Sequence, residues 1–234
     1  MLMTNQIHPL FPTAIYQCKV DGHEEWKELL LSKTEHQFDP NTKTEGATGY
    51  HLTGEARGKG LMHKDEDYLM FFTEIADNIR GCLDGAGVNT DMHELHFMKS
   101  WYTIKEYSDS MGEHFHACAD LSFVYYVDLP VPSGIIFSVD HCPNEYFGGI
   151  YDPKTSGRSH IHTENFINSR SNFIPVEEGD LLVFPGDLPH TIPKESDDKG
   201  THIRSIAGDV KISLKKEYID LETGLIHPSH WRTF

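Results

Sequence analysis

The chain has 234 residues, and its 36 acidic against 20 basic side chains give a formal net charge of −16 at pH 7. This length suits one domain, and the acidic balance disfavours nucleic-acid binding because phosphate backbones are repelled. No stretch approaches the roughly 20 apolar residues that span a bilayer, and the N-terminus lacks the basic start and apolar run of a signal peptide, so we expect a cytoplasmic protein.

The first part of the chain, residues 1–92, is expected to supply a strand and helices that support the core. Residues 8–20 have the pattern of an edge strand, and residues 24–32 that of a short helix. Residues 36–64 are polar and Gly-rich, which predicts a long loop. Over residues 65–83 apolar side chains recur at helical spacing, behind an aspartate that can cap the helix.

From residue 93 to residue 214, short β-rich runs alternate with turns. A helical start followed by many short strands predicts a mainly β fold, with one antiparallel sandwich or barrel and helices packed outside it. We expect residues 1–234 to form a single domain, with residues 215–234 as a C-terminal tail. The expected strands are residues 93–107, 114–129, 134–139, 172–175, 180–184 and 203–214.

Residues 140–171 interrupt this pattern with a polar, Gly-rich insertion that carries several aromatic side chains. So long an insertion in a compact domain is often a lid or a binding loop. Its candidate substrate contacts are Tyr146, Tyr151 and His162.

Three histidines have the spacing of a metal site. His114 and His116 are two apart on a predicted strand, so both project to one face. His190 follows an apolar strand and a Pro/Gly turn. Asp120 is an alternative third ligand if the first strand ends early. Arg204 lies on the next predicted strand, where a buried arginine would need a carboxylate or phosphate partner.

The order of these motifs resembles that of the 2-oxoglutarate- and Fe(II)-dependent oxygenases. It is most similar to a small group of members, frequent in phages and marine bacteria, that carry a His-x-His motif. The resemblance covers roughly Trp101 to Leu214 and the opening Leu10–Thr13. It includes Gly134–Phe137, which looks like the family's Gly-x-Leu-x-Phe strand, and Phe184–His190, which looks like its turn before the second metal histidine.

The resemblance implies a double-stranded β-helix core (a jelly roll, cupin-like) that uses Fe(II), 2-oxoglutarate as co-substrate and O₂. His114 and His190 match the two metal histidines. His116 stands where the commoner motif has a carboxylate, and the loss of that negative charge should weaken Fe(II) binding.

The resemblance also implies a co-substrate site. Arg204 matches the basic residue that pairs with the distal carboxylate of 2-oxoglutarate. Tyr126 matches a tyrosine that contacts the co-substrate, and Ser122, four residues before it, shares its strand face.

The expected activity is hydroxylation of a C–H bond in a small-molecule or peptide substrate, with release of succinate and CO₂. One alternative is a three-His cupin-type dioxygenase that does not use 2-oxoglutarate, in which Arg204 would anchor a substrate carboxylate. Another is a non-catalytic metal-binding β-barrel protein. If the chain is viral, the expected compartment is the host cytoplasm. The sequence does not set the oligomeric state, and a homodimer is one option.

Overall fold

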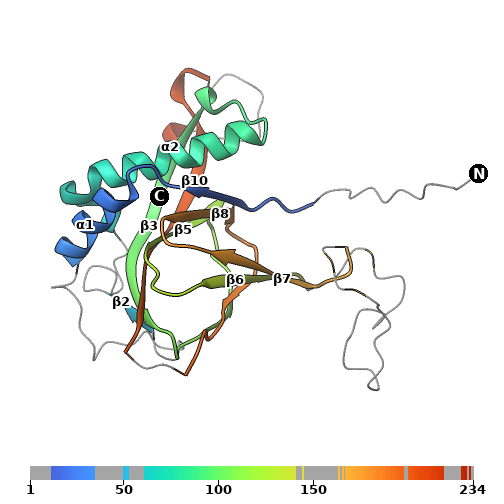
Figure 1. Ribbon diagram of the computed structural model, residues 1–234. Coiled ribbons are helices and arrows are strands. Elements are labelled where there is room, and N and C mark those ends of the chain that lie inside the picture. Colours follow the sequence, from blue (N-terminus) through green and yellow to red (C-terminus); the bar gives the residue numbers. More distant parts are fainter. Residues whose placement is uncertain are drawn as a thin grey trace, which may run out of the picture.

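The computed structural model describes residues 12–34, 50–52, 61–140, 144, 163, 165, 167–197, 200–218, 228–230 and 232, of which residues 50–52 are described for the backbone alone. It shows a jelly roll flanked by helices (Figure 1). The helices are α1 (His23–Thr34) and α2 (Leu69–Gly85). The strands are β1 (Tyr16–Lys19), β2 (Tyr50–Leu52), β3 (His93–Glu106), β4 (Met111–His114), β5 (Leu121–Asp128), β6 (Ser133–Ser138), β7 (Ser171–Val176), β8 (Asp180–Pro185), β9 (His190–Ile192) and β10 (His202–Leu214).

The strands form two antiparallel sheets, in the orders β1-β8-β5-β10-β3-β2 and β4-β9-β6-β7. Because side chains alternate along a strand, the larger sheet has two apolar faces. Its outer face packs under the helices, for example through Tyr125 and Ile206. Its inner face packs on the smaller sheet, for example through Tyr126 and Leu182. The jelly-roll fold expected from the resemblance is thus confirmed.

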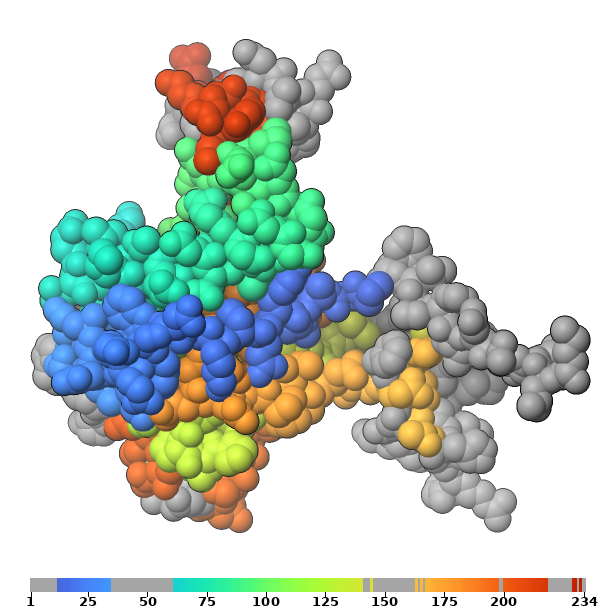
Figure 2. All heavy atoms as spheres, turned by 45° about the horizontal axis from the view of Figure 1, so that its top comes forward, coloured from blue at the N-terminus to red at the C-terminus, as the bar shows by residue number. Residues whose placement is uncertain are grey.

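The helical periodicity predicted over residues 65–83 is confirmed by α2, whose apolar side chains cover the outer face of the larger sheet. The α-helix begins at Leu69, after a 3-10 turn over Glu66–Tyr68. Asp65 caps that turn, since its carboxylate accepts a hydrogen bond from the Asp67 amide at 3.0 Å. Figure 2 shows α2 (teal) and the N-terminal strand and helix (blue) side by side on one face of the molecule. The buried residues of α2 are Phe71, Phe72, Ile75, Ile79 and Leu83.

Glu178, in the turn between β7 and β8, fixes α1 to the sheet. Its carboxylate accepts hydrogen bonds from the Leu129 amide at 3.0 Å and from Lys27 Nζ at 2.9 Å, and His23 Nε2 lies 3.3 Å away. Partial burial opposes ionisation, but these three partners together lower the pKa of Glu178 to about 2. Lys27 also pairs with Asp128 at the end of β5, at 2.9 Å.

Two regions differ from the sequence prediction. Residues 36–64 were expected to be a loop, yet β2 pairs with β3 and a 3-10 turn covers Met62–Lys64. Residues 114–129 were expected to be one strand, yet β4 ends at His114 and β5 begins at Leu121. Cys118, at φ +72°, reverses the chain between them, in a backbone region that non-glycine residues rarely adopt.

The short strand β9 was not predicted, because three residues are too few for a period to be visible. Most of the insertion over 140–171, including Tyr146, Tyr151 and His162, lies outside the described residues. Among the helices that the structure describes, none combines the length and apolar character needed to cross a membrane.

Candidate metal centre

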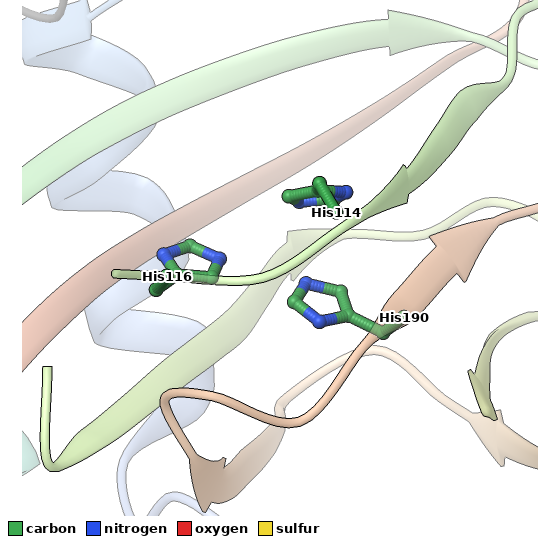
Figure 3. A group of neighbouring side chains, drawn as sticks. All are labelled: His114, His116 and His190. Atoms are coloured by element: carbon green, nitrogen blue, oxygen red, sulfur yellow. The ribbon is translucent and has the colours of Figure 1, made fainter. Parts of the chain in front are cut away.

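The three predicted histidines come together between the two sheets, at the ends of short strands (Figure 3). His114 is the last residue of β4 and His190 the first of β9, and the two residues pair directly in the antiparallel register. His116 follows two residues later, beyond the end of β4. Ring centroids are 4.2 Å apart for His114 and His190, 5.3 Å for His116 and His190, and 5.5 Å for His114 and His116. One ligand nitrogen from each ring lies within 4.8 Å of the other two, so the three rings form a group that can hold one metal ion.

Hydrogen bonds fix which ring nitrogen each histidine can offer to a metal. His114 Nδ1 lies 2.9 Å from the Gly112 carbonyl oxygen, and His190 Nδ1 lies 2.9 Å from the Leu188 carbonyl oxygen. A carbonyl oxygen only accepts, so in both rings Nδ1 carries the proton and Nε2 keeps its lone pair. The two strand histidines are therefore set in the tautomer that binds a metal through Nε2.

The third histidine is held in place although it lies outside a strand. His116 Nδ1 lies 2.6 Å from Asp209 Oδ1 on β10. Trp101 of β3 stacks on the ring with a centroid distance of 5.8 Å and an interplanar angle of 13°. The His116 amide donates to the Gly186 carbonyl at 2.7 Å. These three contacts hold both the ring and the backbone of His116 in place.

Gly186 brings the segment that carries His116 close to the turn that precedes His190. Its amide donates to the Asp120 carbonyl at 3.2 Å, beside the bond from His116. A Cβ at this position would lie 2.6 Å from Ala119 Cβ and 2.7 Å from the Ala119 carbonyl oxygen. The glycine of the Phe184–His190 motif is thus explained by the close approach of two ligand-bearing segments.

Burial keeps the strand histidines neutral. His190 is 3% exposed, and burial lowers its pKa to about 4, against the opposing effect of the hydrogen bond to Leu188. Burial also lowers the pKa of His114. A metal binds only the unprotonated ring, so few protons have to be displaced near neutral pH. Neutral imidazoles suit iron, zinc, copper and nickel.

Asp120, the alternative third ligand, is engaged elsewhere. Its carboxylate accepts a hydrogen bond from Lys211 Nζ at 2.6 Å and another from the Ile212 amide at 2.8 Å. The strand does end early, as that alternative required, but His116 and not Asp120 joins His114 and His190 in the cluster.

Arg204 lies on the outer face of β10, away from the histidines. It stands opposite Ile104 of β3, and its Nη1 donates to Asp128 Oδ2 at 2.8 Å. The side chains of β10 that face inward here are those of Ile203 and Ser205. The resemblance assigned Arg204 to the co-substrate site, whereas in this structure its side chain pairs with Asp128 on the outer face.

The inner face of the larger sheet carries the other polar groups near the cluster. Tyr126 is 4% exposed there. Ser122, also on this face, donates from Oγ to Asp209 at 3.1 Å. Among the buried residues that the structure describes, Lys105 is the one lysine or arginine, and it pairs with Glu195 beyond β9.

Sequence reasoning missed Asp209 as a contact of His116 and Lys105 as a buried cation on the inner face. Both belong to strands that were predicted, but which face of each strand points inward was not assigned. The contact of Asp209 with His116 shows that Asp209 faces inward, and the position of Lys105 opposite Ile203 shows the same for Lys105.

Comparisons with known proteins agree with the fold and with the family that the sequence resembles. Residues 99–207 match the model of a family described as "Putative 2OG-Fe(II) oxygenase". No match was found among curated proteins. A prolyl-4-hydroxylase from Pseudomonas putida is similar in structure, with a TM-score of 0.50 and 12% identity, over 85% of this chain and 92% of that one.

Two other solved structures share the fold. HygX from Streptomyces hygroscopicus, with nickel and 2-oxoglutarate bound, has a TM-score of 0.52 and 11% identity over 85% of this chain and 82% of that one. A prolyl hydroxylase from Trichoplax adhaerens, in complex with a hypoxia inducible factor peptide fragment, has a TM-score of 0.50 and 11% identity, over 84% and 82%. The resemblance to 2-oxoglutarate- and Fe(II)-dependent oxygenases is confirmed, and the histidine cluster fits the metal that this family uses.

Proposed function

Because its central residues match the 2OG-Fe(II) oxygenases and its core has their fold, we propose that this chain is an iron- and 2-oxoglutarate-dependent hydroxylase. Its metal ligands would be His114, His116 and His190. The observation that carries the proposal is the convergence of three imidazoles, two of which are set by backbone carbonyls to offer Nε2. Bound iron would supply the activation of O₂, with 2-oxoglutarate as the reductant: it would lose CO₂ and take up one oxygen atom to become succinate, and the other oxygen atom would enter the substrate C–H bond as a hydroxyl group.

The chain itself would contribute geometry and exclusion of water. His114 and His190 come from paired strands, and His116 is held by Asp209 and Trp101, so the donors need little rearrangement when a metal binds. Three donors from one side leave further positions of an ion open for co-substrate and O₂. No side-chain nucleophile is required.

For the distal carboxylate of 2-oxoglutarate we propose Tyr126 and Lys105 on the inner face, in place of Arg204. Lys105 stands opposite Ile203 in the register of β3 and β10, one residue from the position of Arg204. Its ammonium is buried and already holds the carboxylate of Glu195. A second carboxylate at this point would compete with Glu195 or share the lysine with it.

This assignment can be tested on protein loaded with Ni(II). Lys105→Met alone would leave Glu195 as a buried unpaired charge, so the informative variant is Lys105→Met with Glu195→Gln. We expect it to weaken 2-oxoglutarate binding at least tenfold in calorimetry, and Glu195→Gln alone not to weaken it. Equal affinity of the double variant and the wild type would reject Lys105.

The substrate would be a small molecule or a peptide. One of the structurally similar proteins, the Trichoplax hydroxylase, is in complex with a peptide fragment, which supports a peptide as one candidate. The similar structure from Pseudomonas putida is a prolyl-4-hydroxylase, which also supports a peptide as a candidate substrate.

The function is tested by turnover without the substrate. Anaerobically purified protein would receive Fe(II), ascorbate and 2-oxoglutarate, and succinate would be measured after O₂ is admitted. We expect slow succinate formation in the wild type, none in His190→Ala, and unchanged formation in Asp120→Asn, whose carboxylate is bound to Lys211. Succinate formation that survives His190→Ala would refute the metal assignment.

A three-His dioxygenase that binds its substrate directly to iron is the second candidate. The third histidine and the outward position of Arg204 favour it. A wild type that binds Fe(II) through the three histidines but neither binds 2-oxoglutarate nor forms succinate would establish this alternative. A folded wild type that binds no metal would reject both enzyme assignments.

A further inference from the structure

The third metal position of this chain lacks the negative charge of the usual carboxylate ligand. His116 is an imidazole, and the carboxylate in contact with it is that of Asp209, which lies at Nδ1. We propose that Asp209 is a positioning residue that acts through His116. Its carboxylate fixes the orientation of the ring and supplies a negative charge behind this metal ligand, in place of the charge of a carboxylate ligand. The inference rests on the proposed metal centre.

Asp209 and His116 are in direct contact and are largely shielded from solvent. Oδ1 lies 2.6 Å from His116 Nδ1, and the two side chains are 6% and 13% exposed. The same oxygen accepts a hydrogen bond from Ser122 Oγ at 3.1 Å. An Nδ1 that donates to this carboxylate leaves Nε2 for the metal, the orientation that carbonyl oxygens impose on His114 and His190. Only at His116 is the acceptor an anionic group.

Regular alternation along β10 places Asp209 there. Ile206 and Val210 pack in the outer core, whereas Ala207 packs against the inner core, so Asp209, two residues after Ala207, also faces inward. Asp209 stands opposite Lys99 of β3 and Val210 opposite Phe97, so the extra residue of this bulge lies in β3. Gly208 precedes Asp209, and a Cβ on Gly208 would lie 2.7 Å from the Lys99 carbonyl oxygen, so the strands approach closely at this point.

The physical effect of a buried carboxylate behind a ligand imidazole is to raise the basicity of the ligand. Partners of this kind typically change metal affinity or activity by 10–100-fold. The low dielectric around the pair strengthens the effect, because little water screens the charge. A histidine with Asp209 behind it is thus a better substitute for a carboxylate ligand than a histidine alone.

The test is a metal titration of the metal-free full-length protein with Co(II), whose absorption reports the coordination. Asp209→Asn keeps a side-chain oxygen near Nδ1 but removes the charge, so it isolates the proposed effect. We expect a 10–100-fold loss of Co(II) affinity with the position of the absorption band kept, and a smaller loss for Ser122→Ala. Asp120→Asn removes an equivalent charge outside the cluster, and we expect it to bind Co(II) as the wild type does.

The outcomes separate the inference from the function beneath it. Unchanged affinity in Asp209→Asn overturns the positioning role while the metal centre stands. A loss as complete as in His114→Ala, with an altered absorption band, overturns it in favour of direct ligation by Asp209. A wild type that does not bind Co(II) rejects the metal centre itself, and with it the inference. Thermal unfolding of each metal-free variant verifies that it is folded.

Discussion

Gly186 offers a sharp test of how the metal site is assembled. In Gly186→Ala the new Cβ would meet Ala119 Cβ at 2.6 Å, whereas ordinary contact begins at 3.4 Å. The segment with His116 and the turn before His190 must therefore separate by about 0.8 Å (3.4 − 2.6), since a backbone atom of Ala119 also blocks the site at 2.7 Å.

This displacement is large compared with the tolerance of a metal site, in which ligand distances vary by about 0.2 Å. The hydrogen bond from the His116 amide to Gly186, now 2.7 Å long, would be stretched by the same movement. We expect Co(II) affinity to fall at least tenfold. We also expect the free energy of unfolding to fall by about 1–3 kcal/mol, the usual cost of overpacking, which corresponds to a Tm lower by roughly 2–12 °C in a chain of this size.

Metal titration and thermal unfolding of the metal-free protein measure the two effects. Gly81→Ala is the matched control, because Gly81 lies in α2 on the outer face of the larger sheet and nothing lies within 4 Å of its new Cβ, and we expect it to lower neither quantity. Ala119→Gly in the Gly186→Ala background should restore part of the affinity. A Gly186→Ala protein with wild-type Tm and metal affinity would show that the two segments are not packed as described.

Three further predictions concern charge. His190 has a pKa of about 4 in the folded chain and about 6.5 unfolded, so its contribution to stability is intact above pH 6.5 and is lost as the pH falls toward 4. Metal-free wild type should lose about 2 kcal/mol more between pH 7.5 and pH 5 in urea unfolding than His190→Asn, and equal losses would contradict this. Arg204→Met should lower the Tm by breaking the pair with Asp128, but leave 2-oxoglutarate binding to the Ni(II)-loaded protein unchanged; a large loss of binding would return Arg204 to the co-substrate site. Glu178→Gln should destabilise the protein by about 1–2 kcal/mol in urea unfolding at pH 7. The destabilisation should shrink toward pH 2, because a carboxylate with a lowered pKa stabilises the fold fully above pH 4.5 and loses this contribution in acid. A destabilisation that does not vary with pH would exclude the ionised carboxylate as its cause.

The sequence predicted α2 because an apolar stripe over 17 residues has a visible period. It did not predict β2 or β9, which have three residues each and gain their hydrogen bonds only from partners distant in the chain. The single strand expected over residues 114–129 was wrong for a related reason. The chain turns at Cys118 with a left-handed backbone conformation, and such turns are predicted from glycine, which this position lacks.

The sequence by itself determined the class of the fold, the three histidines and their likeness to one family, because each depends on residue types at short spacings. The tertiary structure decided which face of each strand points inward. That choice placed Arg204 against Asp128 and brought Asp209 to His116. The physical reason is that side chains alternate with a period of two, so a bulge or a shift of one residue, which sequence spacing cannot locate, exchanges the inner and outer positions.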